Sequence, residues 1–295
     1  MQSTSDITSP IHSNLFFSDC YVNENEGACL TACDFVVAIP SYKRAKILSE
    51  RTLAMLTDFG VSPSQIFIFL SGNDDIGEYK RLCPQHTDRI VISPDGFLPT
   101  MRFLHTYFPI GTNVLCMEDD TRELWVKVDD KKRDRMTGVQ FHQMVARGFS
   151  ECMRTGAKLW GLYPVANPMF MKNKINHDLK FIYGVFQAFI STHNPEVLPT
   201  IPLVADIELS IRFFLAYGSV VRFENVALDG SGYCNVPGGL QTLDSRVERE
   251  NECKRYLLHT YPDCCRQKKN CGDNRFELLV GDFRKDKSKP FRIVK

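Results

Sequence analysis

The sequence lacks the features that mark several classes of protein. No apolar run approaches the ~20 residues that span a bilayer, and the first residues have neither the basic start nor the apolar centre of a signal peptide. We therefore expect a protein of the nucleus or cytoplasm, including those of a host cell if the protein is viral, and no membrane partner. The formal net charge is only +1, whereas dedicated nucleic-acid-binding domains are usually clearly basic.

A glycine-rich phosphate loop is also missing. Gly72 and Gly77 are isolated, and no Walker or dinucleotide-binding motif is present, so a kinase or a dehydrogenase is disfavoured. The 11 cysteines are an odd number without the spacing of a secreted disulfide scaffold, which favours reduced thiols.

A regular alternation of strand and helix patterns begins at Asp34. Pro40 is expected to end the first strand, and Gly60 follows the first helix, which runs to Phe59. We expect strands at 35–39, 66–70, 89–93, 113–117, 158–163 and 219–228, an extended hairpin at 181–191, and further helices at 101–107, 137–154 and 206–217. This alternation predicts one α/β domain at 34–280 with a Rossmann-like, mostly parallel sheet flanked by helices. It is expected to follow a polar lead-in at 1–33 and to precede a basic tail at 281–295.

An apolar run at 114–117 ends abruptly in three carboxylates, Glu118, Asp119 and Asp120. The end of a strand in an open sheet is a usual place for a ligand site. Adjacent carboxylates repel one another unless a cation neutralises them, and hard oxygen ligands suit Mg²⁺ or Mn²⁺. An acidic turn after a strand is the alternative interpretation of the cluster.

The first strand ends in a second polar group, listed in sequence order as Pro40, Ser41, Tyr42, Lys43 and Arg44. This junction lies two strands before the acidic cluster, as in the nucleotide-binding half of a GT-A glycosyltransferase. In that fold, the first strand's end holds the base and ribose of a nucleotide sugar, and the acidic cluster holds a metal that bridges the diphosphate. Lys43 or Arg44 would add positive charge near the pyrophosphate, although a solvated first helical turn explains them equally well.

Two carboxylates, Asp206 and Glu208, stand at the start of an amphipathic helix. Helix capping alone explains both. The functional alternative is a general base that takes the proton of an acceptor hydroxyl as it attacks the sugar. Asp206 is the first choice for that base, and Glu208 is the reserve or a group that orients the acceptor.

Other candidates come from single residues. Gly238 and Gly239 suit a loop that approaches the donor closely, and plain turn chemistry explains them as well. Trp160 and Tyr163 follow a strand pattern and are candidates for stacking on an acceptor, with core packing as the alternative for Trp160.

Several phrases occur in the order found in one family. They are AIPSYKRAKILSERTLAML, IFIFLSGNDDIGEY, FPIGTNVLCMEDD, LWGLYPVANPMFM, DLKFIYG, ADIELSIRFFLAYGSVVRFE and PGGLQ, and they extend over most of the chain. Together they resemble the TET/JBP-associated glycosyltransferases, the group that includes the base J glucosyltransferase and related viral enzymes.

This resemblance implies a GT-A fold, UDP-glucose as donor and a divalent metal. It also implies the hydroxymethyl group of a modified DNA pyrimidine as acceptor, with an inverted, β linkage. The metal motif maps to residues 118–120 and the acidic helix start to Asp206 and Glu208. The family usually has aspartate where this chain has Glu118, which leaves Asp119 and Asp120 as metal contacts and Glu118 near the ribose. The third metal ligand stays open among His177, His193 and Asp229. A protein or glycan acceptor, or an inactive binding module, are the alternatives.

Overall fold

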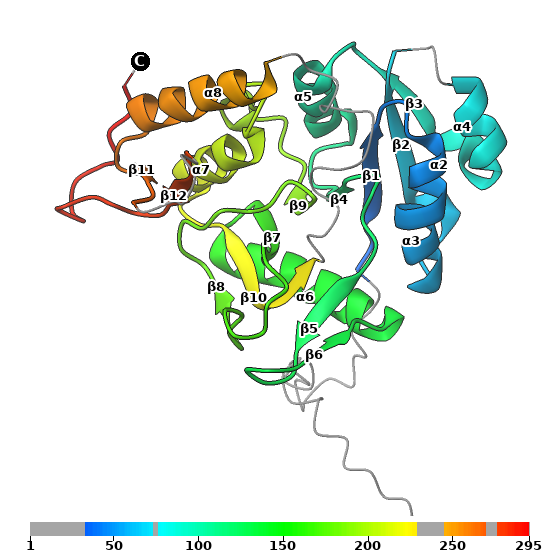
Figure 1. Cartoon of the computed structure of the whole chain (residues 1–295), viewed down its shortest axis with the longest axis horizontal. Coiled ribbons are helices and arrows are strands. Elements are labelled where there is room, and N and C mark those ends of the chain that lie inside the picture. The colour runs from blue at the N-terminus through cyan, green and yellow to red at the C-terminus, as the bar shows by residue number, and fades with distance from the viewer. Residues whose placement is uncertain (1–32, 73–75, 229–244, 270–275, 295) are drawn as a thin grey trace, which may run out of the picture.

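The protein is built around one large mixed sheet, seen in the computed structural model, which describes residues 33–294 apart from 73–75, 229–244 and 270–275 (Figure 1). The strands are β1 (Val36–Ser41), β2 (Ile66–Ser71), β3 (Ile90–Ser93), β4 (Asn113–Met117), β5 (Leu124–Lys127), β6 (Arg133–Arg135), β7 (Leu159–Tyr163), β8 (Ile175–Asn176), β9 (Phe186–Ile190) and β10 (Val221–Leu228). Their order across the sheet is β3-β2-β1-β4-β9-β7-β10-β5-β6, and β8 pairs with β10.

Most of these strands run in one direction. β3, β2, β1 and β4 are parallel, as are β7 and β10, while β9 runs antiparallel between β4 and β7. The predicted α/β class with a mostly parallel sheet is thereby confirmed. The predicted hairpin at 181–191 is wrong, because only its second half is a strand and both partners of that strand come from distant parts of the chain.

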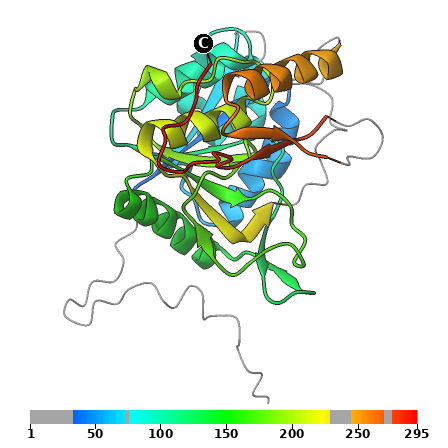
Figure 2. The same ribbon diagram turned by 90° about the vertical axis from the view of Figure 1, so that its left-hand side faces the viewer.

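The helices form a layer on each face of the sheet (Figures 1 and 2). They are α2 (Ala45–Leu48), which continues through a π-helical turn (Ser49–Leu53) into α3 (Ala54–Asp58), and α4 (Ile76–Leu82), α5 (Phe97–Tyr107), α6 (Gly138–Thr155), α7 (Ala205–Tyr217) and α8 (Arg246–Thr260). On one face, α2, α3, α4 and α6 pack on the strand side chains that point to the same side as Val37 and Leu115. On the other face, α5 and α7 pack on those represented by Ala38 and Val114. This alternation of neighbouring residues between faces is the period of a pleated strand.

The sequence pattern predicted that Pro40 ends the first strand, and this is wrong. β1 continues to Ser41, and Pro40 lies opposite Phe69 of β2. On the other side, pairing with β4 stops at Ala38. A proline has no N–H to donate, so it fits where a strand has lost one of its two partners.

The C-terminal part of the chain packs against α7. α8 and a small hairpin of β11 (Cys265–Gln267) and β12 (Leu278–Val280) enclose a separate apolar cluster with residues of α7, such as Ile211. The region expected to be a basic tail folds back here: Gly281 N donates to Cys264 O at 3.0 Å and Val294 N donates to Thr260 O at 3.0 Å.

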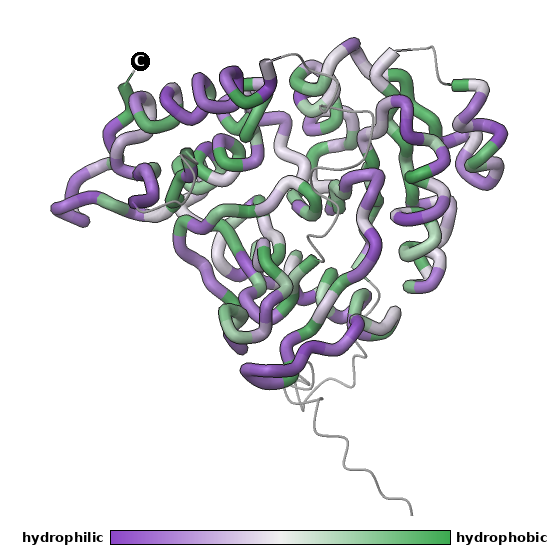
Figure 3. The backbone as a smooth tube through the Cα atoms, viewed as in Figure 1, coloured by the Kyte–Doolittle hydropathy of each residue, from purple (hydrophilic) through white to green (hydrophobic). Residues whose placement is uncertain are grey.

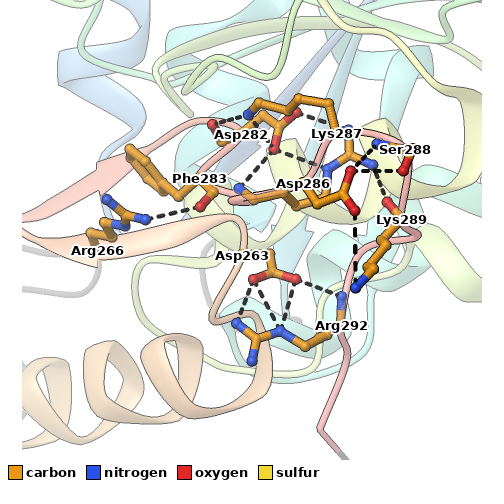
Figure 4. A network of polar contacts seen from close by, with 10 residues as sticks. Asp263, Arg266, Asp282, Phe283, Asp286, Lys287, Ser288, Lys289 and Arg292 are labelled. Carbon is orange, nitrogen blue, oxygen red and sulfur yellow. Dashed lines mark hydrogen bonds and ion pairs between the residues drawn. The ribbon is translucent and has the colours of Figure 1, made fainter.

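Much of the positive charge of that segment is paired internally (Figure 4). Arg292 forms an ion pair with Asp263 at 2.6 Å, and Arg284 and Lys287 contact Asp282 at 2.8 and 2.9 Å. These cations therefore stabilise the fold of the segment instead of forming a free basic surface.

Hydropathy follows this layering (Figure 3), with apolar residues along the central strands and polar residues at the β5–β6 turn. The cysteines within the described part of the chain are free thiols. In that same part, no helix combines the length and apolar character needed to cross a membrane.

Candidate active site

The acidic cluster and the end of the first strand meet at one edge of the sheet. β1 and β4 are parallel neighbours, with Ala38 opposite Cys116. Their carboxyl ends therefore emerge side by side, and the residues that follow them make direct contacts. The strand pairing shows that these two segments are adjacent, which the sequence pattern alone does not.

Asp119 is tied to β1 by a chain of short hydrogen bonds. The Ser41 Oγ donates to Asp119 Oδ2 at 2.6 Å, and the Ser41 Oγ also lies 2.6 Å from the Tyr79 hydroxyl. Since Ser41 has a single proton, which it gives to the carboxylate, Tyr79 donates to Ser41. Tyr79 in turn accepts from the backbone N–H of Arg44 at 3.1 Å. Sequence analysis missed Tyr79, because nothing in its own helix pattern distinguishes it from a core aromatic residue.

Arg44 connects the carboxylates of the cluster. Its Nη1 lies 3.2 Å from Asp119 Oδ1 and 3.7 Å from Asp120 Oδ2. Asp119 is 4% exposed. Burial raises the pKa of Asp119, while Ser41 and Arg44 act to lower it. Arg44 thus takes the place expected of a cation at this cluster, while Lys43, in the left-handed region at φ 55°, places its Nζ over the Tyr42 ring.

The backbone of Glu118 is held by hydrogen bonds, while the surroundings of its carboxyl group disfavour the ionised form. Its N–H donates to Val185 O at 3.1 Å and its carbonyl accepts from Thr52 Oγ1 at 2.8 Å. Burial raises the pKa of the Glu118 carboxyl to about 8, and the negative charges of Asp120, Asp119 and Asp206 add to the rise. Asp206 lies near this cluster, because it accepts from Gly184 N, next to the Val185 carbonyl that accepts from Glu118 N.

Asp206 lies in the first turn of α7, after Val204, whose φ of 51° is rare for a β-branched residue. Its Oδ2 accepts from Gly184 N at 3.1 Å and its Oδ1 from Ile207 N at 3.0 Å. Burial raises the pKa of Asp206 to about 6, against the lowering effect of these two backbone donors. A Cβ on residue 184 would lie 3.2 Å from the Asp206 Cβ, so glycine permits this close approach.

Glu208 lies elsewhere. It is fully buried, and its two oxygens accept from Thr200 N at 2.7 Å, Thr200 Oγ1 at 2.6 Å and Ile201 N at 3.2 Å. Its carboxylate faces the loop before α7 and is not brought together with Glu118–Asp120. This position does not fit the expected reserve base.

The two aromatic candidates differ in position. Trp160 is fully buried, with its ring among those of Phe149, Phe186 and Phe223, so it is a core residue and does not fit an acceptor contact. Tyr163, at the end of β7, is partly exposed, and the Arg222 guanidinium lies 5.3 Å from its ring centroid.

The remaining candidates either lie outside the described residues or bond to other parts of the protein. Gly238, Gly239 and Asp229 lie outside the described residues. His177 contacts Glu151 at 2.9 Å, and His193 contacts the Phe108 carbonyl at 2.7 Å. Neither ring is committed to residues 118–120.

The donor set suits a metal held mainly by its substrate. Within the described ranges, no group of three or more His, Cys, Asp or Glu residues is arranged to hold a metal ion. The cluster offers carboxylates only, of which Asp119 is already bound by Ser41 and Arg44. Mg²⁺ is commonly bound by one or two carboxylates together with phosphate oxygens and water, and Asp120 with one neighbour fits that pattern.

No family model matches the chain, and no curated protein matches it in sequence. Some solved structures are similar to it over part of their backbone. TarS of S. aureus, residues 1–349, has a TM-score of 0.46 with 8% identity over 66% of this chain and 59% of that chain, and it has also been solved in complex with UDP-GlcNAc.

The mannosyltransferase PcManGT from Pyrobaculum calidifontis, solved with GDP-Man and Mn²⁺, has a TM-score of 0.44 with 11% identity over 68% of this chain and 58% of that chain. Mannosyl-3-phosphoglycerate synthase from Rubrobacter xylanophilus has a TM-score of 0.44 with 10% identity over 84% of this chain and 85% of that chain. The chain spans about three fifths of the length of the TarS and PcManGT chains. The likeness describes the α/β fold and assigns no activity.

Proposed function

We propose that this protein is a GT-A-type glycosyltransferase that moves a sugar from a nucleotide sugar, with UDP-glucose as the expected donor, to a hydroxyl acceptor. One observation carries the proposal: Asp206 accepts from Gly184 N, and the next residue, Val185, accepts through its carbonyl from Glu118 N, so the start of α7 lies near the three carboxylates that follow β4. Such a grouping of like charges is costly in a fold without a ligand, and it supplies both parts of a transfer site, a cation-binding group and a base.

The donor side of the proposed site is the edge formed by β1 and β4. Asp120 and Asp119 would hold Mn²⁺ or Mg²⁺, and the bound ion would offset the charge of the departing nucleoside diphosphate. Asp119 is oriented by the Ser41 Oγ at 2.6 Å, and Arg44 lies close enough to contribute a second positive charge. Glu118 is the group proposed to face the ribose, together with residues 40–43.

The acceptor side is formed by Asp206. Its raised pKa of about 6 leaves it ionised at neutral pH and more basic than an ordinary aspartate. In the proposed step, the acceptor oxygen bonds to the anomeric carbon as the bond to the diphosphate oxygen breaks. The acceptor proton passes to Asp206, and the electron pair leaves with the diphosphate. Attack opposite the leaving group inverts the anomeric centre.

The proposed acceptor is the hydroxymethyl group of a modified pyrimidine in DNA. The resemblance of the ordered sequence phrases to the TET/JBP-associated glycosyltransferases supports this acceptor. Tyr163, a partly exposed aromatic residue at the end of β7, is the group proposed to stack on the base. A protein or glycan acceptor is the alternative within the same activity, and an inactive GT-A-like module that binds nucleic acid or protein is the alternative outside it.

The test is direct incubation of the protein with Mn²⁺, a panel of UDP-sugars and DNA that contains hydroxymethyluracil or hydroxymethylcytosine, read by mass spectrometry of the nucleosides. A hexose adduct on one of these bases is expected. Unmodified DNA together with sugar transfer to a protein or glycan would reject the acceptor, and no transfer with any acceptor would reject the enzyme.

Two variants assign the roles. Asp120→Asn should lose transfer and the thermal stabilisation by UDP with Mn²⁺, because donor binding then lacks its metal contact. Asp206→Asn should keep that stabilisation and lose turnover. Full activity of Asp120→Asn would remove the metal assignment, and near-normal turnover of Asp206→Asn would remove the base. Glu151→Gln, a buried glutamate of α6 paired with Arg147 and Arg154, serves as control.

A further inference from the structure

The loop before α7 is fastened to the first turn of that helix by one buried carboxylate. Glu208 is fully buried, and its Oε2 accepts from the backbone N–H groups of Thr200 and Ile201 at 2.7 and 3.2 Å. Its Oε1 accepts from the Thr200 hydroxyl at 2.6 Å. These three hydrogen bonds hold the loop at the point where it enters the helix.

Two further residues, Arg212 and Tyr261, contact the Glu208 carboxylate. Arg212, one turn further along α7, and Tyr261, at the end of α8, each lie 3.5 Å from Glu208 Oε1, and Arg212 Nη1 is 3.2 Å from the Tyr261 hydroxyl. Glu208 therefore connects the loop, its own helix and α8. Because both carboxylate oxygens of Glu208 make these contacts, Glu208 is not available to contact a substrate.

The loop that Glu208 fastens ends in strained backbone. Val204, the residue before α7, has φ 51° and ψ 30°. A β-branched residue in this region is strained and persists only when its surroundings fix its conformation. The carbonyl of Val204 accepts the first helical N–H groups, from Ile207 and Glu208. The turn at 204 thus sets the direction of the residues that follow it.

Asp206 is the residue whose position this turn decides. Its carboxylate points away from Glu208, toward Gly184 N at 3.1 Å, and its charge raises the pKa of Glu118. Glu208 and Asp206 are two residues apart and serve opposite sides of the same helical turn. Glu208 binds the loop at Thr200, whereas Asp206 binds Gly184, the neighbour of the residue whose carbonyl accepts from Glu118 N.

We propose that Glu208 is a positioning residue for Asp206: by binding residues 200 and 201, it holds the strained turn at Val204 and so keeps the Asp206 carboxylate against Gly184. This inference rests on the proposed function, in which Asp206 is the base. A misplacement of about 1 Å in a reacting group can cost about 100-fold in rate, so loss of the fastening should appear in kcat and leave donor binding intact.

The primary experiment uses Thr200, which is exposed. Thr200→Ala removes the hydroxyl donor at 2.6 Å, and Thr200→Ser keeps it. We expect kcat to fall about 10-fold in Thr200→Ala and to stay within about twofold of native in Thr200→Ser, with the donor KM unchanged in both. Equal kcat values in these two variants would overturn the proposal.

Glu208→Gln provides the stronger perturbation. We expect a loss of kcat of about 10- to 100-fold in the folded protein, with thermal stabilisation by UDP and Mn²⁺ retained. Glu151→Gln is the matched control, since it also neutralises a buried, arginine-paired glutamate on a helix. It should lower the melting temperature without changing kcat. A kcat loss in the control equal to that in Glu208→Gln would show a general effect of destabilisation and overturn the proposal.

A double variant and a crystal structure separate this inference from the proposed function. If Glu208 acts through Asp206, adding Glu208→Gln to Asp206→Asn should leave the residual turnover unchanged. In crystals of Thr200→Ala, the Gly184 N to Asp206 Oδ2 contact should lengthen or break, a readout that needs no activity. An unchanged contact would reject the positioning role even if transfer occurs. If Asp206→Asn kept native turnover while the Asp206 carboxylate moved in Thr200→Ala, Asp206 would be rejected as the base. The positioning of Asp206 by Glu208 would still stand.

Discussion

Replacing Glu118 by glutamine should stabilise the protein at high pH. The pKa of the Glu118 carboxyl is raised from 4.5 to about 8, first by burial and then by Asp120, Asp119 and Asp206. The native state therefore binds a proton that the unfolded chain has released, so stability falls as the pH rises from 4.5 to 8. Glutamine stays neutral, so the variant does not lose stability from this position over the same pH range.

The size of the effect follows from the same shift. At about 1.4 kcal/mol for each pH unit, a rise from 4.5 to about 8 sets an upper limit near 5 kcal/mol. Glu118 is partly exposed, so solvent screening lowers the expectation to about 2 kcal/mol. For a chain of this length, that corresponds to about 4–8 °C in melting temperature.

The assay is thermal unfolding by circular dichroism at pH 4.5, 6.5 and 8.5 in the presence of EDTA. The melting temperatures of Glu118→Gln and native protein should agree at pH 4.5, and the variant should exceed the native protein increasingly as the pH rises. Mn²⁺ with UDP should stabilise the native protein most at pH 8.5.

Glu151→Gln supplies a control of opposite sign. Burial acts to raise the pKa of Glu151, but Arg154, His177 and Arg147 outweigh it and the pKa is lowered. Its stabilising effect is therefore present above the unfolded pKa and is lost as the pH falls, so Glu151→Gln should be destabilising at pH 8.5. A difference between Glu118→Gln and native protein that is independent of pH, or that has the sign of the control, would refute the electrostatic account of the cluster.

Further predictions concern the base, the cation site and the core. Because the pKa of Asp206 is about 6 and the base must be ionised, kcat should fall tenfold per pH unit below about pH 6; a flat profile from pH 5 to 8 would contradict this role. Arg44→Gln should bind Mn²⁺ more tightly in titration calorimetry without donor, because Arg44 Nη1 lies 3.2 and 3.7 Å from Asp119 and Asp120, and weaker metal binding would contradict the competition. Gly148→Ala would place a Cβ 2.5 Å from the buried Trp160 ring. Overpacking should cost about 1–3 kcal/mol, more than the gain of about 1 kcal/mol in helix propensity, with a lowered urea midpoint as the measurement and a raised one as the contrary result.

The parts of the fold that the sequence predicted have local causes. β4 was predicted at its observed bounds, since a run of buried residues between Thr112 and the carboxylates leaves little choice. The helix that ends before Gly60 was predicted with its buried face, because its apolar residues recur at helical spacing. The short β5, β6 and β8 were missed, because two to four residues are too few to show a period.

Long-range contacts explain what was missed in the candidate site. Tyr79 reaches Ser41 and Arg44 across the gap between α4 and β1, and Gly184 approaches Asp206 from the segment before β9. Neither residue type signals such a contact in its own neighbourhood. Glu208 was grouped with Asp206 because both are acidic and near a helix start; only the packed loop at Thr200 distinguishes them.

The antiparallel strand β9 has a consequence for how this chain folds. β9 lies between β4 and β7, with Phe186 paired to Met117 and Ala188 paired to Trp160. Across the sheet, β9 is therefore the link between strands β1–β4 on one side and strands β7 and β10 on the other. These two groups of strands can join only after the chain has been made through β9, and pairing between residues so far apart in the sequence slows folding.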